Sequence, residues 1–507
     1  MSKYSALVCA VMAFALASGL SLAQAARSPI IVTVSPDTTT VASSQLVQLT
    51  ALVKNTPSSA VRWSVSAGSI SSTGLYHAPR VNSDTVITVK ATSLVDSSKA
   101  SVASILVTAP KPKAATAATM KLAGTTINES FFGAGFHGWG VWPPTDGQKQ
   151  VATLGGIRLW DDNVKWAQIE TAKGVYDWLR LDTWISKAQA QHVDVLYTIG
   201  STPQWAGTSP KSSPCGAQGR YSCLPPKDLN ADGTGADAYF SDFVTALVTR
   251  YKGQIAYYEL WNEADCTCFF SGTTAQIVRM GKDAAAIIRS IDPNAKILSP
   301  SAHGPTMATW FDNYVAAGGA ANFDIVNAHL RGKGSTNASP EAFLTMYNDV
   351  TAELSKRNLT QLPIWDDEYG IKPGQMTDPD QLAGFVARSL ALRAGVGVQR
   401  QYIYTWDAGS LGLQGNESGT AFDVVAGWLL NHSISPCVAS GTVYTCNLDS
   451  GQIVWDTAQS CHNRSCTTSK YTYPTEYHYQ IDLTGTKSQL GGSTVAIGYK
   501  PIFLTAN

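Results

Sequence analysis

The chain has 507 residues, too many for one ordinary hydrophobic core, so two or three domains are expected. Lys plus Arg and Asp plus Glu both number 37, which gives a net charge of zero and no basic surface for nucleic acid or an anionic membrane. Its 14 Trp and 20 Tyr suit a protein that stacks aromatic rings on neutral sugars. A carbohydrate is therefore the expected partner. The oligomeric state is not indicated.

The N-terminus carries the features of an export signal. Lys3 is followed by an apolar run from Ala6 to Leu22 and then by the small-residue sequence Ala23-Gln24-Ala25. This pattern predicts a signal peptide over residues 1–25. No later apolar run reaches the length of a membrane span. We therefore expect a secreted or periplasmic protein after cleavage.

The cysteines favour disulfide bonds. Cys9 lies in the signal peptide, and the remaining even number in an exported chain is typical of disulfides rather than metal ligands. A bridge across a single residue is strained, so Cys266 and Cys268 either pair with each other or reach the loop of another pair. Three pairs are close in sequence: Cys215/Cys223, Cys437/Cys446 and Cys461/Cys466.

Residues 28–109 contain short β-branched runs between turn residues, which predicts a small β-sandwich. Three features resemble bacterial immunoglobulin-like domains: Ser35-Pro36 after the first run, the segment Val61 to Val65 with Trp63 on an expected central strand, and the segment Gly68 to Pro79. Residues 110–120 are rich in Pro, Lys, Ala and Thr and predict a linker.

Residues 121–419 alternate short apolar runs with amphipathic segments, a pattern typical of parallel strands with crossover helices. Ala236 to Tyr251 and Thr274 to Ser290 are expected helices. Eight runs fit the eight strands of a (β/α)₈ TIM barrel, an α/β fold. These are Phe131–His137, Gly156–Trp160, Val193–Gly200, Ala256–Glu263, Lys296–Pro300, Ile325–His329, Pro363–Glu368 and Gln401–Tyr404.

The helical period disappears from Thr420 onward, and short apolar runs such as Ile453-Val454-Trp455 return. Residues 420–507 are therefore predicted to form a β-rich C-terminal domain. No linker-like segment separates it from the barrel, so we expect the two to pack together.

Two of the expected barrel strands end on a glutamate, Glu263 and Glu368. Their separation in sequence equals about three strand–helix units of roughly 35 residues, which places them after the fourth and seventh strands. Active sites of such barrels lie at the carboxyl ends of the strands. A pair of carboxyl groups at that end fits cleavage of a glycosidic bond, which needs one acid to protonate the leaving oxygen and one carboxylate to attack or stabilise the sugar.

The other polar or aromatic residues that close strands suit sugar binding. Arg158 is expected to keep Glu368 anionic, while burial beside neutral Asn262 is expected to raise the pKa of Glu263. His137 and His329 could contact substrate or could be hydrogen-bonded wall residues. Trp205, which follows Gln204, and Trp406 complete the set of expected substrate-binding residues.

Asp366 and Asp367 immediately precede Glu368 and are competing candidates for the nucleophile. Strand alternation predicts that Asp366 shares the face of Glu368 and that Asp367 points away from it. Glu368 therefore remains the predicted nucleophile.

Residues 128–507 resemble the retaining glycoside hydrolases of clan A, most closely family 39. The motifs are Gly156-Ile157-Arg158, Trp166 with Glu170, Gly174 and Tyr176, Thr202 to Ala206, Trp261-Asn262-Glu263 and Asp324 to His329. The resemblance implies that Glu263 is the general acid/base, Glu368 the nucleophile, Asn262 the partner of a sugar 2-hydroxyl and Trp406 the floor of a subsite. The acids before Glu368 depart from the clan, whose members often carry smaller or neutral residues there.

Two alternatives remain open at this stage. One is a carbohydrate-binding or adhesion protein without catalysis, which the immunoglobulin-like segment and the many aromatic residues favour. The other is an endo-β-glycanase similar to family 5. No His-x-x-x-His pair and no acidic loop with metal spacing occur, so neither a metal nor another cofactor is expected.

Overall fold

The computed structural model describes residues 28–108 except 43–44, 80 and 82–83, residues 126–138, 142, 154–208, 215, 219, 221–331, 339–371, 375–407 and 412–507. The chain forms two compact units, Met1–Pro110 and Lys111–Asn507. The predicted signal peptide lies outside the described residues, as does almost all of the linker.

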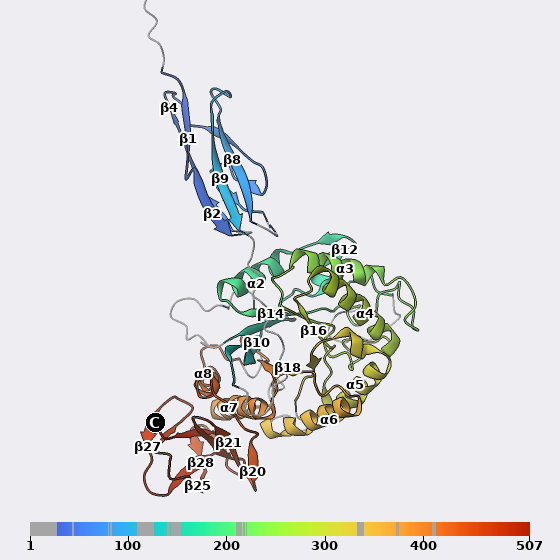
Figure 1. Cartoon of the computed structure of the whole chain (residues 1–507), viewed down its shortest axis with the longest axis vertical. Coiled ribbons are helices and arrows are strands. Elements are labelled where there is room, and N and C mark those ends of the chain that lie inside the picture. The colour runs from blue at the N-terminus through green and yellow to red at the C-terminus, as the bar shows by residue number, and fades with distance from the viewer. Residues whose placement is uncertain are drawn as a thin grey trace, which may run out of the picture. The chain divides into compact units, whose positions relative to one another are not determined.

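The first unit is built from β-strands around its own core (Figure 1). Its largest sheet has the order β2-β9-β8-β5, in which β2 (Thr38–Ala42) is an edge strand and β8 (Thr85–Ser93) and β9 (Ala100–Thr108) pair antiparallel. Alternate residues of β8 and β9 point into the core, as expected for strands with one buried face. Trp63 lies on β5 (Val61–Val65) at the edge of this sheet, so its predicted place on a central strand is wrong. An immunoglobulin-like topology stays a prediction.

The second unit contains a sheet of eight parallel strands, with helices on its outside (Figure 1). A parallel bridge between Leu298 and Ile325 joins the two end strands and closes the sheet. The predicted (β/α)₈ barrel is thereby confirmed. In sheet order the strands are β16 (Lys296–Leu298), β15 (Tyr257–Glu259), β14 (Asp194–Thr198), β11 (Gly156–Leu159), β10 (Phe132–Gly135), β19 (Arg400–Ile403), β18 (Ile364–Tyr369) and β17 (Val326–Asn327).

Amphipathic helices cover the barrel. The two helices expected from the sequence are confirmed with small shifts at their ends, as α3 (Ala238–Arg250) and α4 (Thr274–Ile291). α4 begins in a capping box between Thr273 and Gln276, in which each side chain binds the other residue's backbone N–H. The others are α2 (Leu179–Ala190), α5 (Met307–Ala316), α6 (Phe343–Lys356), α7 (Pro379–Val396) and α8 (Glu417–Leu429).

Helix α8 corrects the predicted boundary between the barrel and the C-terminal domain. It spans Glu417–Leu429 and packs against α7, so the expected loss of helical structure at Thr420 is wrong. Phe422, Val425 and Leu429 face the core, but Ser418 and Gly419 on the same helix are buried as well. A helix buried on most of its surface has no clear polar stripe, and therefore no clear period. The β-rich part begins only at β20 (Val438–Ser440).

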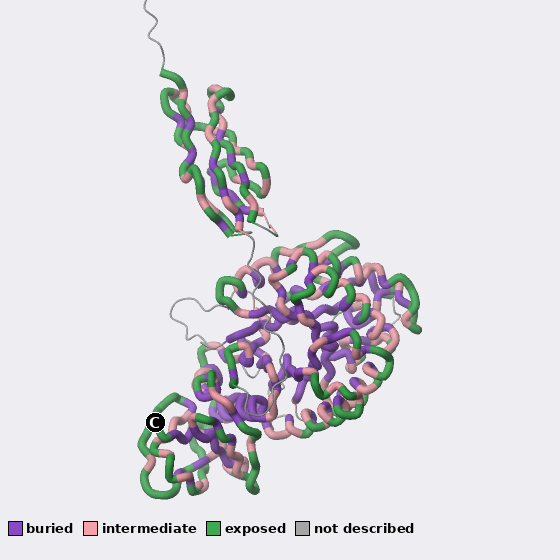
Figure 2. Tube along the Cα trace, viewed as in Figure 1, coloured by how far each residue is buried: buried purple, intermediate pink, exposed green. Residues whose placement is uncertain are grey.

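The C-terminal strands form a six-stranded antiparallel sheet that packs on the barrel, as predicted. Trp455 Nε1 donates to Glu341 Oε1 at 2.9 Å, and Lys500 Nζ lies 2.6 Å from Asp380 Oδ1. Figure 2 shows α7 buried along its length at this junction. The sheet consists of β20, β21 (Val443–Leu448), β22 (Gly451–Asp456), β29 (Ile502–Thr505), β26 (Tyr479–Ile481) and β27 (Lys487–Gln489).

Four disulfides are present among the described residues: Cys215–Cys223, Cys266–Cys268, Cys437–Cys446 and Cys461–Cys466. The three predicted close pairs are confirmed, and Cys266 pairs with Cys268 rather than with another loop. Among the helices of the described residues, none combines the length and apolar character that crossing a membrane requires.

Candidate active site

The barrel brings Glu263 and Glu368 together at the carboxyl ends of its strands. Glu368 belongs to β18, and Glu263 follows β15 by four residues. One carboxylate oxygen of each lies within 4.8 Å of the other and of a His329 nitrogen. Both carboxylate side chains are 9% exposed, so they are reachable yet largely removed from water.

Arg158, on β11, is a cation that contacts several carboxylates of this site. Its Nη1 donates to Glu368 Oε2 at 2.8 Å, which is the contact predicted from the sequence. Nη2 donates to Glu259 Oε2 at 2.8 Å and to Asn262 Oδ1 at 2.6 Å, while Nε lies 2.9 Å from Asp367 Oδ2. Burial opposes the charge of Arg158, but these carboxylates outweigh it and raise its pKa well above the usual value.

His329 lies between two carboxylates and is fully buried. Its Nδ1 is 2.8 Å from Glu263 Oε1, and its Nε2 is 3.0 Å from Asp367 Oδ1. Burial alone would lower the pKa of His329, but the surrounding carboxylates raise it well above its usual value. His329 therefore contacts the predicted acid/base directly.

The pKa of Glu263 differs from the sequence-based expectation. Burial raises it, as expected, but the hydrogen bond from His329 and the charges of His329, Arg331 and His303 outweigh burial and hold the pKa at about 2. The predicted elevation of the Glu263 pKa is therefore wrong. The sequence could not reveal this because the cations belong to later strands.

Asp366 and Asp367 point in the opposite directions to those predicted. Asp366 is directed to the outside, where Arg393 of α7 donates to its Oδ2 at 2.7 Å. Asp367 points inward to Arg158 and His329, on the same side as Glu368. The register of β18 shifts between Asp366 and Tyr369, which breaks strand alternation and explains the error.

Glu263 occupies a strained backbone position. Its φ is +41°, in the left-handed region that non-glycine residues rarely adopt. The conformation is fixed by Ser301, since Glu263 N donates to Ser301 Oγ at 2.9 Å and Ala264 N donates to Ser301 O at 2.9 Å. Strain held by surrounding contacts is common where a side chain must be aimed at a reaction centre.

Two basic residues of the site were not singled out from the sequence. Arg331 donates through Nη2 to Glu368 Oε1, and His303 Nδ1 lies 3.8 Å from Glu263 Oε2 and 3.1 Å from Asp265 Oδ1. Arg331 follows His329 by two residues, which is the only signal that pointed to it. His303 follows β16 at a place where the sequence carries no distinctive motif.

His137 belongs to a polar group at the edge of the site. Its Nε2 is 2.5 Å from the Tyr404 hydroxyl and 3.4 Å from Asp161 Oδ2. The hydrogen bond to Asp161 raises the pKa of His137. The guanidinium of Arg331 lies 5.8 Å from the Tyr404 ring centre, which connects this group to Glu368.

The two tryptophans that were predicted to bind substrate, Trp205 and Trp406, lie in different environments. Trp406 is fully buried and its ring stacks on Phe136 with 5.7 Å between centroids, so the structure does not open it as a subsite floor. Trp205 is half-buried and packs edge-to-face on Trp166 and Tyr239. The contacts of Trp205 in the described part of the chain do not include either glutamate.

Among the residues that the structure describes, three groups of side chains have metal-ligand geometry, namely Glu259/His329/Asp367, Glu263/His329/Glu368 and Asp380/Cys461/Cys466. In the first two the carboxylates hold the guanidinium groups of Arg158 and Arg331. In the third both cysteines are in a disulfide and Asp380 holds Lys500. Ion pairs therefore account for the first two groups, and a disulfide with an ion pair accounts for the third.

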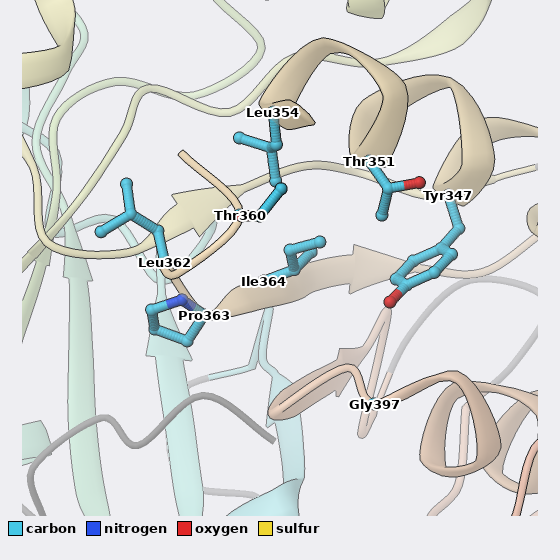
Figure 3. Close-up of a pocket in the computed structure, with 8 residues that line it drawn as sticks. All are labelled: Tyr347, Thr351, Leu354, Thr360, Leu362, Pro363, Ile364 and Gly397. Carbon is cyan, nitrogen blue, oxygen red and sulfur yellow. The ribbon is translucent and has the colours of Figure 1, made fainter. Parts of the chain in front are cut away.

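A separate pocket of about 110 Å³ lies at the amino end of β18, the end opposite Glu368 (Figure 3). Tyr347, Thr351 and Leu354 of α6 line one side, and Pro363 and Ile364 line another. The lining has no carboxylate or imidazole, so this pocket has no part in the chemistry of the glutamate pair.

The barrel unit is similar to several solved structures. A GH39 enzyme from Xanthomonas axonopodis pv. citri aligns with 16% identity over 76% of this chain and 95% of its own, with a TM-score of 0.49. A GH30 endoxylanase from Clostridium papyrosolvens aligns with 12% identity over 76% and 99%, with a TM-score of 0.47. A glucosidase from Croceicoccus marinus aligns with 16% identity over 75% and 97%, with a TM-score of 0.46. No protein-family model matches the sequence, and comparison with curated proteins finds no match.

Proposed function

We propose that this protein is a retaining glycoside hydrolase that cleaves β-glycosidic bonds of a neutral oligo- or polysaccharide. The observation that carries the proposal is the approach of Glu263 and Glu368 to within 4.8 Å between oxygens at the carboxyl end of the barrel. Two carboxyl groups about 5–5.5 Å apart belong to retaining enzymes, whereas inverting enzymes separate them by about 6.5–9.5 Å to admit a water molecule.

The contacts of the two glutamates support different roles. Glu368 receives hydrogen bonds from both Arg158 and Arg331, which fix the position of its carboxylate for nucleophilic attack. Glu263 Oε1 lies 2.8 Å from His329 Nδ1, which is a group that can pass a proton to it. We therefore assign Glu368 as the nucleophile and Glu263 as the acid/base.

In the first step Glu368 attacks the anomeric carbon while Glu263 protonates the leaving oxygen, which gives a glycosyl-enzyme. In the second step Glu263 removes a proton from water, and the water displaces Glu368. Asn262 is fixed by accepting a hydrogen bond from Arg158 through Oδ1, which orients its Nδ2 as a donor for the sugar 2-hydroxyl.

Export is part of the proposal. Four disulfides suit an oxidising compartment, and a glycosidase acting on polysaccharide has to meet its substrate there. Sequencing the N-terminus of protein recovered outside the cytoplasm tests whether cleavage follows Ala25.

A panel of aryl glycosides and defined oligosaccharides tests the activity, and NMR of the first-formed anomer tests the stereochemistry. Retention is expected. Inversion would overturn the covalent mechanism. Sugar binding without turnover of any member of the panel would instead favour a non-catalytic binding protein.

The roles of the two glutamates are separated by Glu368→Ala and Glu263→Ala. Without the nucleophile, even an activated aryl glycoside should be nearly inert, and azide should rescue it to an α-glycosyl azide. Glu263→Ala should still be glycosylated by substrates whose leaving group needs no proton, and azide should then give a β-glycosyl azide. Either substitution should lower kcat/KM by about 10²-fold or more for glycosides with poor leaving groups. Azides with the opposite configurations would mean that the two assignments are exchanged.

A further inference from the structure

Asp367 is a third carboxylate in the site, and it has no role in the two-glutamate mechanism. It is 1% exposed and contacts His329 Nε2 and Arg158 Nε, but not Glu263. We propose that Asp367 is a positioning residue that acts through His329 to hold the proton that Glu263 uses as an acid. The inference rests on the proposed function for its kinetic consequence, while the charge of His329 can be measured independently.

The first support is the geometry of the imidazole. Nδ1 of His329 lies 2.8 Å from Glu263 and Nε2 lies 3.0 Å from Asp367. Carboxylates only accept hydrogen bonds, and a neutral imidazole has one donor nitrogen and one acceptor nitrogen. A neutral His329 would leave one of these contacts between two acceptors. Both contacts are satisfied together only when His329 is an imidazolium.

The second support is the charge balance of the buried cluster. Arg158, Arg331 and His329⁺ supply three positive charges, and Glu263, Asp367 and Glu368 supply three negative charges. Glu259 would add a fourth, but burial and the nearby charge of Asp367 raise its pKa to about 8. Since an uncompensated buried charge is costly, a neutral Glu259 and a protonated His329 form the balanced state.

The proton can move within this cluster without creating new net charge. In the first step the Nδ1 proton of His329 passes to Glu263, and the Glu263 carboxyl protonates the leaving oxygen. The imidazole becomes neutral and keeps its Nε2–H on Asp367. In the second step Glu263 takes a proton from the attacking water and returns one to Nδ1. Asp367 thus fixes which nitrogen keeps its proton and which one exchanges it.

Several charged groups act on His329 from the surrounding elements. Asp367 and Glu368 of β18 and Glu263 after β15 favour its charged form, and His303 after β16 opposes it. Glu259 on β15 and Asp366 on β18 lie within electrostatic reach. Among these residues, Asp367 is the one that contacts Nε2.

Asp367→Asn tests the proposal because the amide keeps the size of the carboxylate and an oxygen beside Nε2 but carries no charge. For a glycoside with a poor leaving group, the alkaline limb of kcat/KM should move down by about 1–3 pH units, the effect of one nearby opposite charge. For an activated aryl glycoside, which needs no acid, the same limb should not move. An equal loss of kcat/KM on both substrates at every pH would indicate that Asp367 has a merely structural role, and it would overturn the proposal.

Asp194→Asn is the matched control. Asp194 is also buried and pairs with Arg400 at 2.9 Å, but it lies at the amino end of its strand, away from Glu263. This variant should lower the stability of the protein, but it should leave the alkaline limb of kcat/KM unchanged for both substrates. A shift as large as that of Asp367→Asn would show that loss of any buried charge pair perturbs the profile.

The charge of His329 is measured by ¹⁵N NMR of protein labelled at histidine. The His329 signal is assigned as the one that is present in the wild type and missing in His329→Gln. Wild-type His329 should show two protonated nitrogens at pH 7, and Asp367→Asn should lose the second proton at lower pH. A neutral His329 in the wild type overturns the proposal, and this reading does not need Asp367→Asn to fold. If no glycoside is turned over, the proposed function fails while NMR still decides the charge.

Discussion

Glu259 is the residue whose ionisation should be most visible in stability. It is fully buried beside Asp367 and Arg158, and burial raises its pKa from 4.5 to about 8. Between those values the folded protein binds a proton that the unfolded chain has released, so stability should fall as pH rises through this window. Glu259→Gln resembles the protonated form and does not titrate. Its melting temperature relative to wild type should therefore increase from pH 5 to pH 8.

Calorimetry of the barrel unit at several pH values measures this difference. Glu353→Gln, at a half-buried position on α6, reports how far any Glu-to-Gln change alters the pH dependence. A difference between Glu259→Gln and wild type that stays constant with pH would mean that Glu259 is already ionised at pH 5.

For single residues, the sequence identifies those that close strands. It does not predict the direction of a side chain where the backbone of the strand is irregular. Glu263, Glu368, Asn262, Arg158 and His329 were all selected because they end apolar runs, and the structure brings them together. Asp367 was assigned to the wrong face because a register shift within β18 cannot be read from alternation. The pKa of Glu263 was mispredicted for a related reason, since its partner His329 comes from a distant strand.

At the scale of elements, α7 is the helix that joins the barrel to the C-terminal sheet. Arg388 of α7 forms an ion pair with Glu341, and the ring of Tyr499 lies 4.4 Å from its guanidinium. Glu341 also accepts the hydrogen bond from Trp455 of β22. Glu341→Gln removes the negative charge and leaves a guanidinium that is 3% exposed without it, which should cost about 3–5 kcal/mol of unfolding free energy.

Denaturant unfolding, followed by tryptophan fluorescence, measures the loss of unfolding free energy in Glu341→Gln. Glu353→Gln again serves as the control, because it removes a pair with Lys356, which is 57% exposed, and such a pair contributes at most about 1 kcal/mol. Equal losses for the two variants would contradict the role of Glu341 at the junction. The pH profile of activity should not change in either variant.

The elements were predictable where a strand is a short, fully buried apolar run or where a helix has one exposed face. The eight strands were found from apolar runs bounded by turns, and α3 and α4 from their three- and four-residue intervals. α8 was missed because Trp428, Phe422 and Ala426 all face protein, so the polar stripe that defines an amphipathic helix is interrupted. Its burial depends on the C-terminal sheet and α7, which local sequence does not reveal.

At the scale of the whole molecule, the two units should respond differently to deletion. Residues 28–109 belong to a unit with its own core of residues such as Leu49, Val89 and Ile105, distinct from the barrel core. We predict that this unit is a spacer, so its removal should leave kcat/KM on small soluble glycosides unchanged. Loss of turnover after this deletion would mean that the unit shapes the active site.

Removing the C-terminal sheet should have a different result, and the cut has to respect α8. A chain that ends after Asn431 keeps helices α2 to α8 and the eight described strands of the barrel but removes Trp455, Tyr499 and Lys500, which cover Glu341, Arg388 and Asp380. Buried side chains along α7 would then meet water, and an exposed apolar patch of this kind favours aggregation. We therefore expect insoluble protein, measured as the soluble fraction after expression beside the deletion of residues 28–109. A soluble and active chain ending at Asn431 would show that the sheet is dispensable, despite the buried ion pair and hydrogen bonds at the junction.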